Sequence, residues 1–356
     1  MTRRRSLLAV LFAAVLGVSG VGFAGHAVAK APVGVLAGKD WQTGALPKGV
    51  TKKNIDSLVA TAMGDKTNRI RVRSVLIAIN DKIVYERYHP LDTKTTLMDT
   101  MSVSKSVTSA LVGMLVADGK LTLDQPAPVA AWADPNDPRH NITIRNLLNM
   151  SSGLQWREDY VSPDSSTLAM LRSPVASDYA AAQPLRFTPG SKFEYNSGNS
   201  AILMGIVTDT LGGVAATDAF IKARLLDPLG IKGIAFQRDP AGRIVGFMGI
   251  NMTAREMARF GLLYLNNGSW GTKSVIPADW VAFSRTASPM SPKYAGHWWT
   301  YKDAFEAEGY YGQFVLVSSS KKMVMVITTA TEGPADVQWA KATGLRDALY
   351  AMFPAA

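Results

Sequence analysis

Runs of β-forming residues lie near both ends of this chain, with a long helical stretch between them, and this arrangement limits the fold more than any other feature. Residues 73–88 contain two such runs around Asn80-Asp81, a dipeptide typical of a hairpin turn. Near the other end, three further runs are expected to form strands at 297–301, 313–318 and 323–329. The last two are separated by a short polar turn, which also predicts a hairpin.

Helices are expected beside these strands and between them. Helical periodicity covers 53–63, before the first strand, and 335–352, after the last one. The stretch at about 125–240 is richer in Pro, Ser and short helical segments, so we expect a mostly helical insertion there. Strands from both ends can then pair in one antiparallel sheet, flanked by the N- and C-terminal helices. This arrangement belongs to the α+β class.

The first 29 residues have the pattern of a signal peptide. Three arginines precede an uncharged run rich in Gly and Ala, which ends in Ala27-Val28-Ala29. A transmembrane anchor is the alternative, but the glycines between positions 17 and 25 and the small-residue ending favour cleavage. We therefore expect residues 30–356 to be exported, periplasmic or secreted, with no stable membrane insertion after cleavage. The Sec and twin-arginine routes both stay open.

Composition removes several classes of function. The chain has no cysteine, which excludes a disulfide framework and a thiol nucleophile. Its 356 residues, 47% of them hydrophobic, are enough to bury a large core. Removing the signal takes away three arginines and no acid, so the formal charge of +10 falls by three, to +7. Lysines and arginines are scattered without an aromatic-interleaved block, so no nucleic-acid partner is expected. The sequence carries no signal for an oligomeric state.

Few patterns of reactive side chains remain. His26 leaves with the signal, and His89, His140 and His297 have no spacing that places two metal ligands on one helix face. The chain has no G-x-S-x-G elbow and no G-x-x-x-x-G-K-[ST] phosphate loop. We therefore expect no metal and no cofactor, and a Ser-His-Asp triad would have to use one of these histidines.

The remaining candidate is the run from Ser102 to Lys105, at the start of an apolar helix expected over 102–117. Residues three apart share one helix face, so the Ser102 hydroxyl and the Lys105 amine can meet as a nucleophile and its base. The pattern S-x-x-K also occurs at Ser318 and Ser319, but there it falls at a hairpin turn. Burial against an apolar helix would lower the pKa of Lys105 from about 10.4 toward neutrality.

Together with the segments 118–124 and 144–154, this run resembles the serine β-lactamase and penicillin-recognising superfamily. The resemblance spans about residue 50 to the C-terminus. It is closest to the class C-like branch, which includes β-lactamases, D-alanyl-D-alanine peptidases, family VIII carboxylesterases and 6-aminohexanoate-dimer hydrolases. It implies a β-lactamase/transpeptidase-like fold and makes Tyr195, in the second motif, the third catalytic residue.

Two departures from the family motifs bear on the substrate. Ser197 stands where an asparagine usually contacts the substrate amide, which leaves Asn196 as a candidate substrate contact. Ala307 stands where the third motif usually carries the cation that binds the carboxylate of β-lactams and peptide ends. Gly309 matches the glycine of that motif and is expected to line the substrate site.

Further assignments also rest on the resemblance. It implies an oxyanion hole made by the backbone N–H groups of Ser102 and Tyr310. The segment from Gly153 to Tyr160 is similar to the loop of 6-aminohexanoate-dimer hydrolases whose tyrosine closes over the bound amide. Tyr160 is therefore a candidate substrate contact, and an ordinary surface aromatic is the alternative.

These residues and the resemblance predict a serine hydrolase that cleaves a small ester or linear amide through an acyl-enzyme on Ser102. A β-lactamase or a D-alanyl-D-alanine carboxypeptidase is the alternative substrate assignment. A non-catalytic envelope binding protein of the same fold is an alternative of another class. The joint presence of Ser102, Lys105 and Tyr195 is the feature against it.

Overall fold

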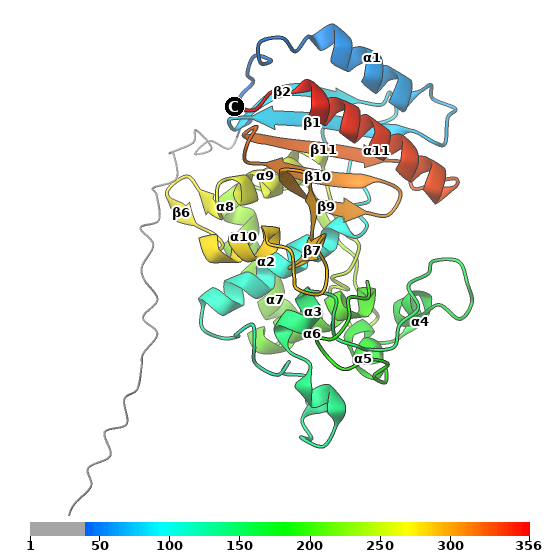
Figure 1. The fold of residues 1–356 in the computed structure, drawn as a ribbon, viewed down its shortest axis with the longest axis vertical. Coiled ribbons are helices and arrows are strands. Elements are labelled where there is room, and N and C mark those ends of the chain that lie inside the picture. Colours follow the sequence, from blue (N-terminus) through cyan, green and yellow to red (C-terminus); the bar gives the residue numbers. More distant parts are fainter. Residues whose placement is uncertain (1–39) are drawn as a thin grey trace, which may run out of the picture.

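The computed structural model describes residues 40–356, so the expected signal peptide lies outside the described residues. A seven-stranded antiparallel sheet runs across the molecule (Figure 1). Its strands follow the order β2-β1-β11-β10-β9-β8-β7. Their bounds are β1 (Val72–Ile79), β2 (Lys82–Tyr88), β7 (Tyr294–Ala295), β8 (Trp298–Tyr301), β9 (Ala304–Gly309), β10 (Gln313–Ser318) and β11 (Met323–Thr329). The first and last hairpins of the chain therefore meet at β1 and β11, as the sequence predicts.

Two smaller antiparallel ladders accompany the main sheet. Strand β3 (Ile234–Phe236) pairs with β4 (Ile250–Met252), and β5 (Ser269–Trp270) pairs with β6 (Lys273–Ser274). The β3–β4 ladder leads into the segment at Phe247, which approaches the helix that carries Ser102.

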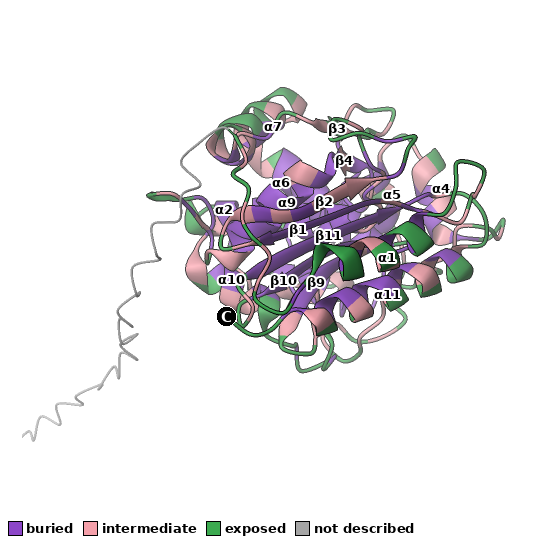
Figure 2. Cartoon of the chain, turned by 90° about the horizontal axis from the view of Figure 1, so that it is seen from above, coloured by how far each residue is buried: buried purple, intermediate pink, exposed green. Residues whose placement is uncertain are grey.

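The main sheet separates two hydrophobic cores, because both of its faces are covered. In β1, Leu76 and Ala78 join the larger core, whereas Val75 and Ile77 point into the smaller one. Helices α1 (Lys52–Met63) and α11 (Ala335–Met352) lie side by side over the smaller core (Figure 2). Helices α2 (Val103–Ala117) and α9 (Ala254–Leu265) pack into the larger one. Such double coverage explains why β1 reads as an almost continuous apolar run.

The remaining helices lie mostly below the sheet in Figure 1. They are α3 (Ile144–Leu148), α4 (Ser166–Arg172), α5 (Ala176–Ala181), α6 (Ser197–Leu211), α7 (Val214–Ile221), α8 (Asp227–Leu229) and α10 (Ala278–Arg285), with single-turn helical segments at 130–132, 138–141 and 222–226. All but α10 fall in the expected helical stretch of about 125–240. The α+β prediction is confirmed, while the exact domain boundaries stay predictions.

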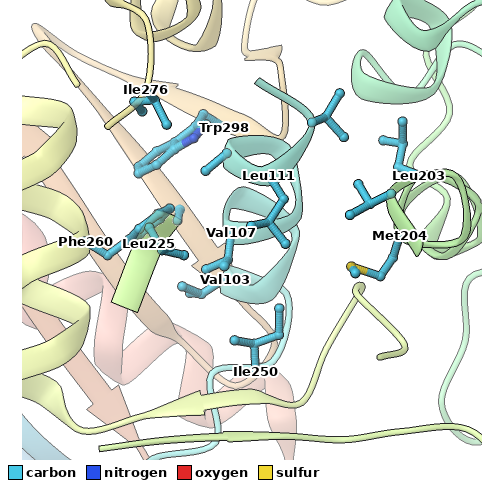
Figure 3. Packing of buried hydrophobic residues seen from close by; sticks show 14 of the residues in the cluster. Val103, Val107, Leu111, Leu203, Met204, Leu225, Ile250, Phe260, Ile276 and Trp298 are labelled. Atoms are coloured by element: carbon cyan, nitrogen blue, oxygen red, sulfur yellow. The ribbon is translucent and has the colours of Figure 1, made fainter. Parts of the chain in front are cut away.

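Helix α2 is buried on all sides. Its residues from Val103 to Leu115 are all buried, which is the pattern of a central core helix rather than a surface one. Figure 3 shows it between Phe260 and Trp298 on one side and Leu203 and Met204 on the other. Any charge on this helix therefore has little access to water.

Strand β9 was not anticipated from the sequence. Its residues Ala304–Gly309 are rich in Ala and Glu, which are depleted in strands, so local preference does not reveal it. In the structure, Glu306 and Glu308 lie on the same face of β9. Their carboxylates are 2.6 and 3.9 Å from the guanidinium of Arg346, which α11 places against that face. This buried cation compensates the two glutamates, a tertiary effect that sequence periodicity does not carry.

Among residues 40–356, no single helix is both long and apolar enough to span a membrane. The two helices at 197–211 and 214–229, which meet at a sharp bend, reach the required length and apolar composition only when they are taken together.

Candidate active site

The turn before α2 holds Ser102 in a constrained backbone. Met101, directly before it, has φ 47°, in the left-handed region that costs a non-glycine residue free energy. Strand β9 lies against this turn at Gly309, where a Cβ atom would come 2.4 Å from the carbonyl oxygen of Thr100. Only glycine fits this approach, so Gly309, at the third-motif position, is in direct contact with the turn before Ser102.

Ser102 and Lys105 meet as the three-residue spacing predicts. The Lys105 amine donates to the Ser102 hydroxyl at 2.9 Å and to the carbonyl oxygen of Phe247 at 3.1 Å. Its side chain is buried, 5.0 Å above the ring centre of Tyr195. Burial lowers the pKa of Lys105 from 10.5 to about 8, against the opposing charge of Glu158. The amine is thus available as a base near neutral pH, when about a tenth of it is unprotonated.

Tyr195 is fixed among aromatic rings. It stacks on Trp299 with ring centres 5.8 Å apart and meets Tyr294 edge-on at 6.1 Å. Burial raises its pKa well above 10, with further contributions from neighbouring phenols and Glu158, while the Ser102 hydroxyl acts in the opposite direction. Tyr195 therefore remains a protonated phenol beside Ser102 and has a proton that it can donate.

These groups open into a cavity of 340 Å³. It is lined by aromatic and acidic side chains together with the nucleophile and β9: Ser102, Glu158, Asp159, Tyr160, Tyr195, Trp299, Glu308, Gly309, Tyr310 and Trp339. Within the described part of the chain, none of the residues that line this cavity is Lys, Arg or His. Tyr160 and Tyr310 stack across it with ring centres 5.1 Å apart.

Glu158 is the site residue that sequence reasoning missed. Its carboxylate accepts hydrogen bonds from the Ser197 amide at 2.8 Å, the Ser197 hydroxyl at 2.5 Å, the Trp156 indole at 2.8 Å and the Tyr160 hydroxyl at 3.1 Å. A signal for it does exist in the sequence, since Trp156, Glu158 and Tyr160 alternate. Alternate residues of an extended segment share one face.

The structure brings most of the predicted site residues together. Ser102, Tyr160, Tyr195, Gly309 and Tyr310 line one cavity, with Lys105 bonded to Ser102. In the described chain, neither the Ser102 nor the Tyr310 backbone N–H has a hydrogen-bond partner. Both donors are therefore free to bind a ligand oxygen, and the oxyanion hole stays a prediction.

Two positions lie elsewhere. Asn196 does not line the cavity, because its side chain accepts from the Asn199 amide at 3.3 Å and caps α6. Ala307, at the position of the missing cation, is 1% exposed and belongs to the larger hydrophobic core. The cavity wall on β9 is made instead by Glu308 and Gly309.

The competing patterns have ordinary structural roles. Ser318 pairs with the Tyr350 hydroxyl at 3.1 Å, and the Lys321 amine donates to the carbonyl of Phe353, so this second S-x-x-K does not form a pair. His297 is buried against the Ser200 hydroxyl at 3.0 Å, and burial lowers its pKa to about 3. It stays neutral at physiological pH. Residues 40–356 contain no group of three or more His, Asp or Glu side chains that could hold a metal ion.

Comparison with known proteins identifies the family of this chain. A model of the Beta-lactamase family matches residues 54–349. The chain belongs to the beta-lactamase family. The 6-aminohexanoate-dimer hydrolase of Paenarthrobacter ureafaciens is 28% identical over 197 residues, which cover 51% of this chain and 48% of the relative. Esterase EstB of Burkholderia gladioli is 29% identical over 189 residues, covering 45% and 46% of the two chains. The chain thus spans about half the length of these relatives.

A solved structure extends the likeness to almost the whole described chain. The penicillin-binding protein homologue from Caulobacter crescentus superposes with a TM-score of 0.65, covering 87% of this chain and 99% of that one at 16% identity. At such low identity the superposition shows the fold alone. This family member therefore has the β-lactamase-like fold, and its named relatives are a 6-aminohexanoate-dimer hydrolase and an esterase.

Proposed function

We propose that this protein is an exported serine hydrolase that cleaves a small ester or linear amide through an acyl-enzyme on Ser102. The observation that carries the proposal is the Lys105 amine, held 2.9 Å from the Ser102 hydroxyl with a pKa of about 8, next to an open cavity. A lysine with this pKa is the base that a serine nucleophile needs when no histidine is available.

The first half of the reaction forms the acyl-enzyme. Neutral Lys105 takes the hydroxyl proton of Ser102, whose oxygen attacks the substrate carbonyl carbon, and the carbonyl electron pair moves to its oxygen. The backbone N–H groups of Ser102 and Tyr310 then hold this oxyanion. As the intermediate collapses, the bond to the leaving group breaks and Tyr195 gives its proton to the leaving atom. The Lys105 ammonium, 5.0 Å from the Tyr195 ring centre, restores that proton.

The second half returns the free enzyme. A water molecule gives one proton to Lys105 and attacks the acyl carbon, the bond to Ser102 breaks, and the proton returns to the serine oxygen. Every group then regains its starting protonation state, so no cofactor is required.

The charge of the cavity favours a substrate without a carboxylate near the scissile bond. Glu158 and Asp159 line the cavity, and none of the described residues that line it is a cation. Glu308, the third acidic residue of the lining, is compensated by Arg346 at 3.9 Å. Hydrogen bonds lower the pKa of Asp159 to about 2, and the hydrogen bond with the Ser162 hydroxyl has the largest effect. This part of the wall is therefore anionic at neutral pH. β-Lactams and peptide C-termini carry a carboxylate that this cavity would repel. The relatives named 6-aminohexanoate-dimer hydrolase and esterase EstB support the same choice.

The test is a substrate panel run on the wild type, Ser102→Ala and Ser109→Ala. The panel contains short acyl p-nitrophenyl esters, 6-aminohexanoate dimer, a D-Ala-D-Ala peptide and nitrocefin. Ser109 is a matched control, because it is a buried serine of the same helix whose hydroxyl has no hydrogen-bond partner among residues 40–356. We expect ester or linear amide turnover that only Ser102→Ala abolishes, together with a serine-phosphonate adduct seen by intact mass. Faster nitrocefin turnover would favour a β-lactamase, and the absence of any adduct would favour a binding protein.

A further inference from the structure

The four donors on Glu158 account for the whole hydrogen-bonding capacity of its carboxylate. One oxygen accepts from two groups that can only donate, the Ser197 amide and the Trp156 indole, both at 2.8 Å. The other oxygen accepts from two hydroxyls, Ser197 at 2.5 Å and Tyr160 at 3.1 Å. An ionised carboxylate offers about four lone-pair positions, so none is left for a substrate. Glu158 therefore acts on the reaction through its partners rather than by touching the substrate.

Among the three residues that donate to Glu158, Tyr160 is the one that lines the cavity. Its ring is held by the stack on Tyr310, and its hydroxyl is held by Glu158. It lines the same cavity as Ser102, whose hydroxyl is near enough to influence the ionisation of the phenol. A phenol has one proton and two lone pairs. Since the proton points to Glu158, only lone pairs are left to face the cavity.

We propose that Glu158 is a positioning residue that fixes the hydroxyl proton of Tyr160, so that Tyr160 faces the substrate as a hydrogen-bond acceptor and selects a scissile group with an N–H. This inference rests on the proposed function and narrows it to secondary amides in preference to esters. An amide N–H can donate a hydrogen bond to the Tyr160 oxygen. An ester oxygen can only accept, so it would face the lone pairs of the Tyr160 oxygen with no hydrogen bond between them.

The serine at position 197 fits this role. Its hydroxyl and backbone amide are both used by Glu158, so the small side chain provides the anchor for the carboxylate at the start of α6. The departure from the family asparagine at this position is thus matched by the glutamate that bonds to it. Together they tie the loop that carries Tyr160 to the helix that follows Tyr195.

Glu158→Gln is the decisive substitution, because the two carboxylate oxygens have different partners. The glutamine carbonyl can stay on the Ser197 amide and the Trp156 indole, which can only donate. Its NH₂ group then faces the two hydroxyls, which can accept. Tyr160 would receive a hydrogen bond from Gln and turn its own proton toward the cavity. The fold keeps its hydrogen bonds while the phenol changes from acceptor to donor.

The experiment compares the p-nitroanilide and the p-nitrophenyl ester of one short acyl chain. The ratio of their kcat/KM values is measured for the wild type, Glu158→Gln, Tyr160→Phe and the double variant. We expect Glu158→Gln to lower the anilide-to-ester ratio about three- to tenfold, the scale of one hydrogen bond. In the Tyr160→Phe background the same substitution should leave the ratio unchanged, because its effect passes through the phenol. Asp164→Asn is the matched control, an exposed carboxylate of the same loop that bonds to Arg157.

Three results would overturn the inference. They are an equal loss on anilide and ester in Glu158→Gln, a change of ratio that persists without the Tyr160 hydroxyl, and a shift of equal size in Asp164→Asn. Thermal midpoints and phosphonate labelling of Ser102 establish that each variant is folded with an intact nucleophile. A wild type that neither turns over nor takes the label would refute the proposed function itself. Turnover with an unaltered ratio would refute only the role of Glu158.

Discussion

Lys105 lies on helix α2 among apolar and aromatic groups, whereas Glu158 lies in the cavity wall among polar ones. Lys105 has two hydrogen-bond partners, and its surroundings include the rings of Tyr195 and Phe247. Glu158 has four donors. Burial lowers the pKa of Lys105 to about 8, which suits this lysine to the proposed role of a base. The fully bonded glutamate is suited to hold other groups in place.

The same difference extends to the two sides of the cavity. The side formed by α2 and β9 is held by close packing, as at Gly309, where no Cβ fits. The side formed by the loop before α4 is held by hydrogen bonds that converge on Glu158. A substitution on the first side should therefore act through shape and desolvation, and one on the second through lost bonds.

The largest effect is expected for Lys105→Met, which should lower kcat/KM about a thousandfold because the base is lost. The same variant should be more stable than the wild type. In the folded protein the pKa of Lys105 is about 8 instead of 10.5, so burial of the ammonium costs up to about 3 kcal/mol below pH 8.

The sign of this stability effect can be checked by its pH dependence. Between pH 8 and 10.5 the unfolded chain binds more protons at Lys105 than the folded one, so wild-type stability rises with pH there. The advantage of Lys105→Met should accordingly fade above pH 10. Urea unfolding at several pH values measures it, with the exposed Lys120→Met as control. A variant less stable than the wild type at pH 7 would contradict the picture of an under-solvated lysine.

Glu158→Ala should destabilise the protein by about 2–4 kcal/mol, because it leaves the Ser197 amide and the Trp156 indole without their main acceptor. Chemical unfolding measures the change. Glu332→Ala, at an exposed carboxylate, is the control and should stay within about 0.5 kcal/mol of the wild type. Equal stability of the two variants would show that the hydrogen bonds on Glu158 do not hold this side of the cavity.

Gly309→Ala should lower kcat/KM about 10- to 100-fold, since the added Cβ pushes on the backbone of Thr100, two residues before the nucleophile. A loss of about 1–3 kcal/mol in stability should accompany it. Gly344→Ala on α11 is the matched control, because a Cβ there meets nothing within 4 Å. That substitution should be neutral or slightly stabilising. Wild-type activity of Gly309→Ala would mean that the close contact of β9 with the turn is not needed.

Sequence reasoning worked where local patterns and tertiary structure agree. Apolar patterns predict the helices at 53–63 and 335–352 and the strands at 313–318 and 323–329, and the structure has helices and strands over these residues. The pairing of Ser102 with Lys105 followed from helix geometry alone. These features depend on residues close together in the chain.

The parts that were missed depend on distant partners. Strand β9 carries glutamates that Arg346 compensates from the far end of the chain. In the sequence, Glu158 resembles a surface residue of a charged loop, because the contact with Ser197 is visible only in the structure. Asn196 is a candidate substrate contact in the sequence, and in the structure it is the N-cap of α6, where its side chain accepts from the Asn199 amide. A polar side chain in a loop thus takes its role from its neighbours in space.

The smallest expected effect is that of the Glu158 charge on the pKa of Lys105. Activity on a neutral ester should rise with pH through about 8 and then level off, because Lys105 must lose its proton to act as the base. The negative charge of Glu158 favours the ammonium form and so raises the pKa of Lys105, although burial is the larger influence. In Glu158→Gln the midpoint of the kcat/KM profile should therefore move to lower pH, by less than about one unit. Asp164→Asn should leave the midpoint in place. A shift to higher pH in Glu158→Gln would mean that the glutamate does not act on Lys105 through its charge.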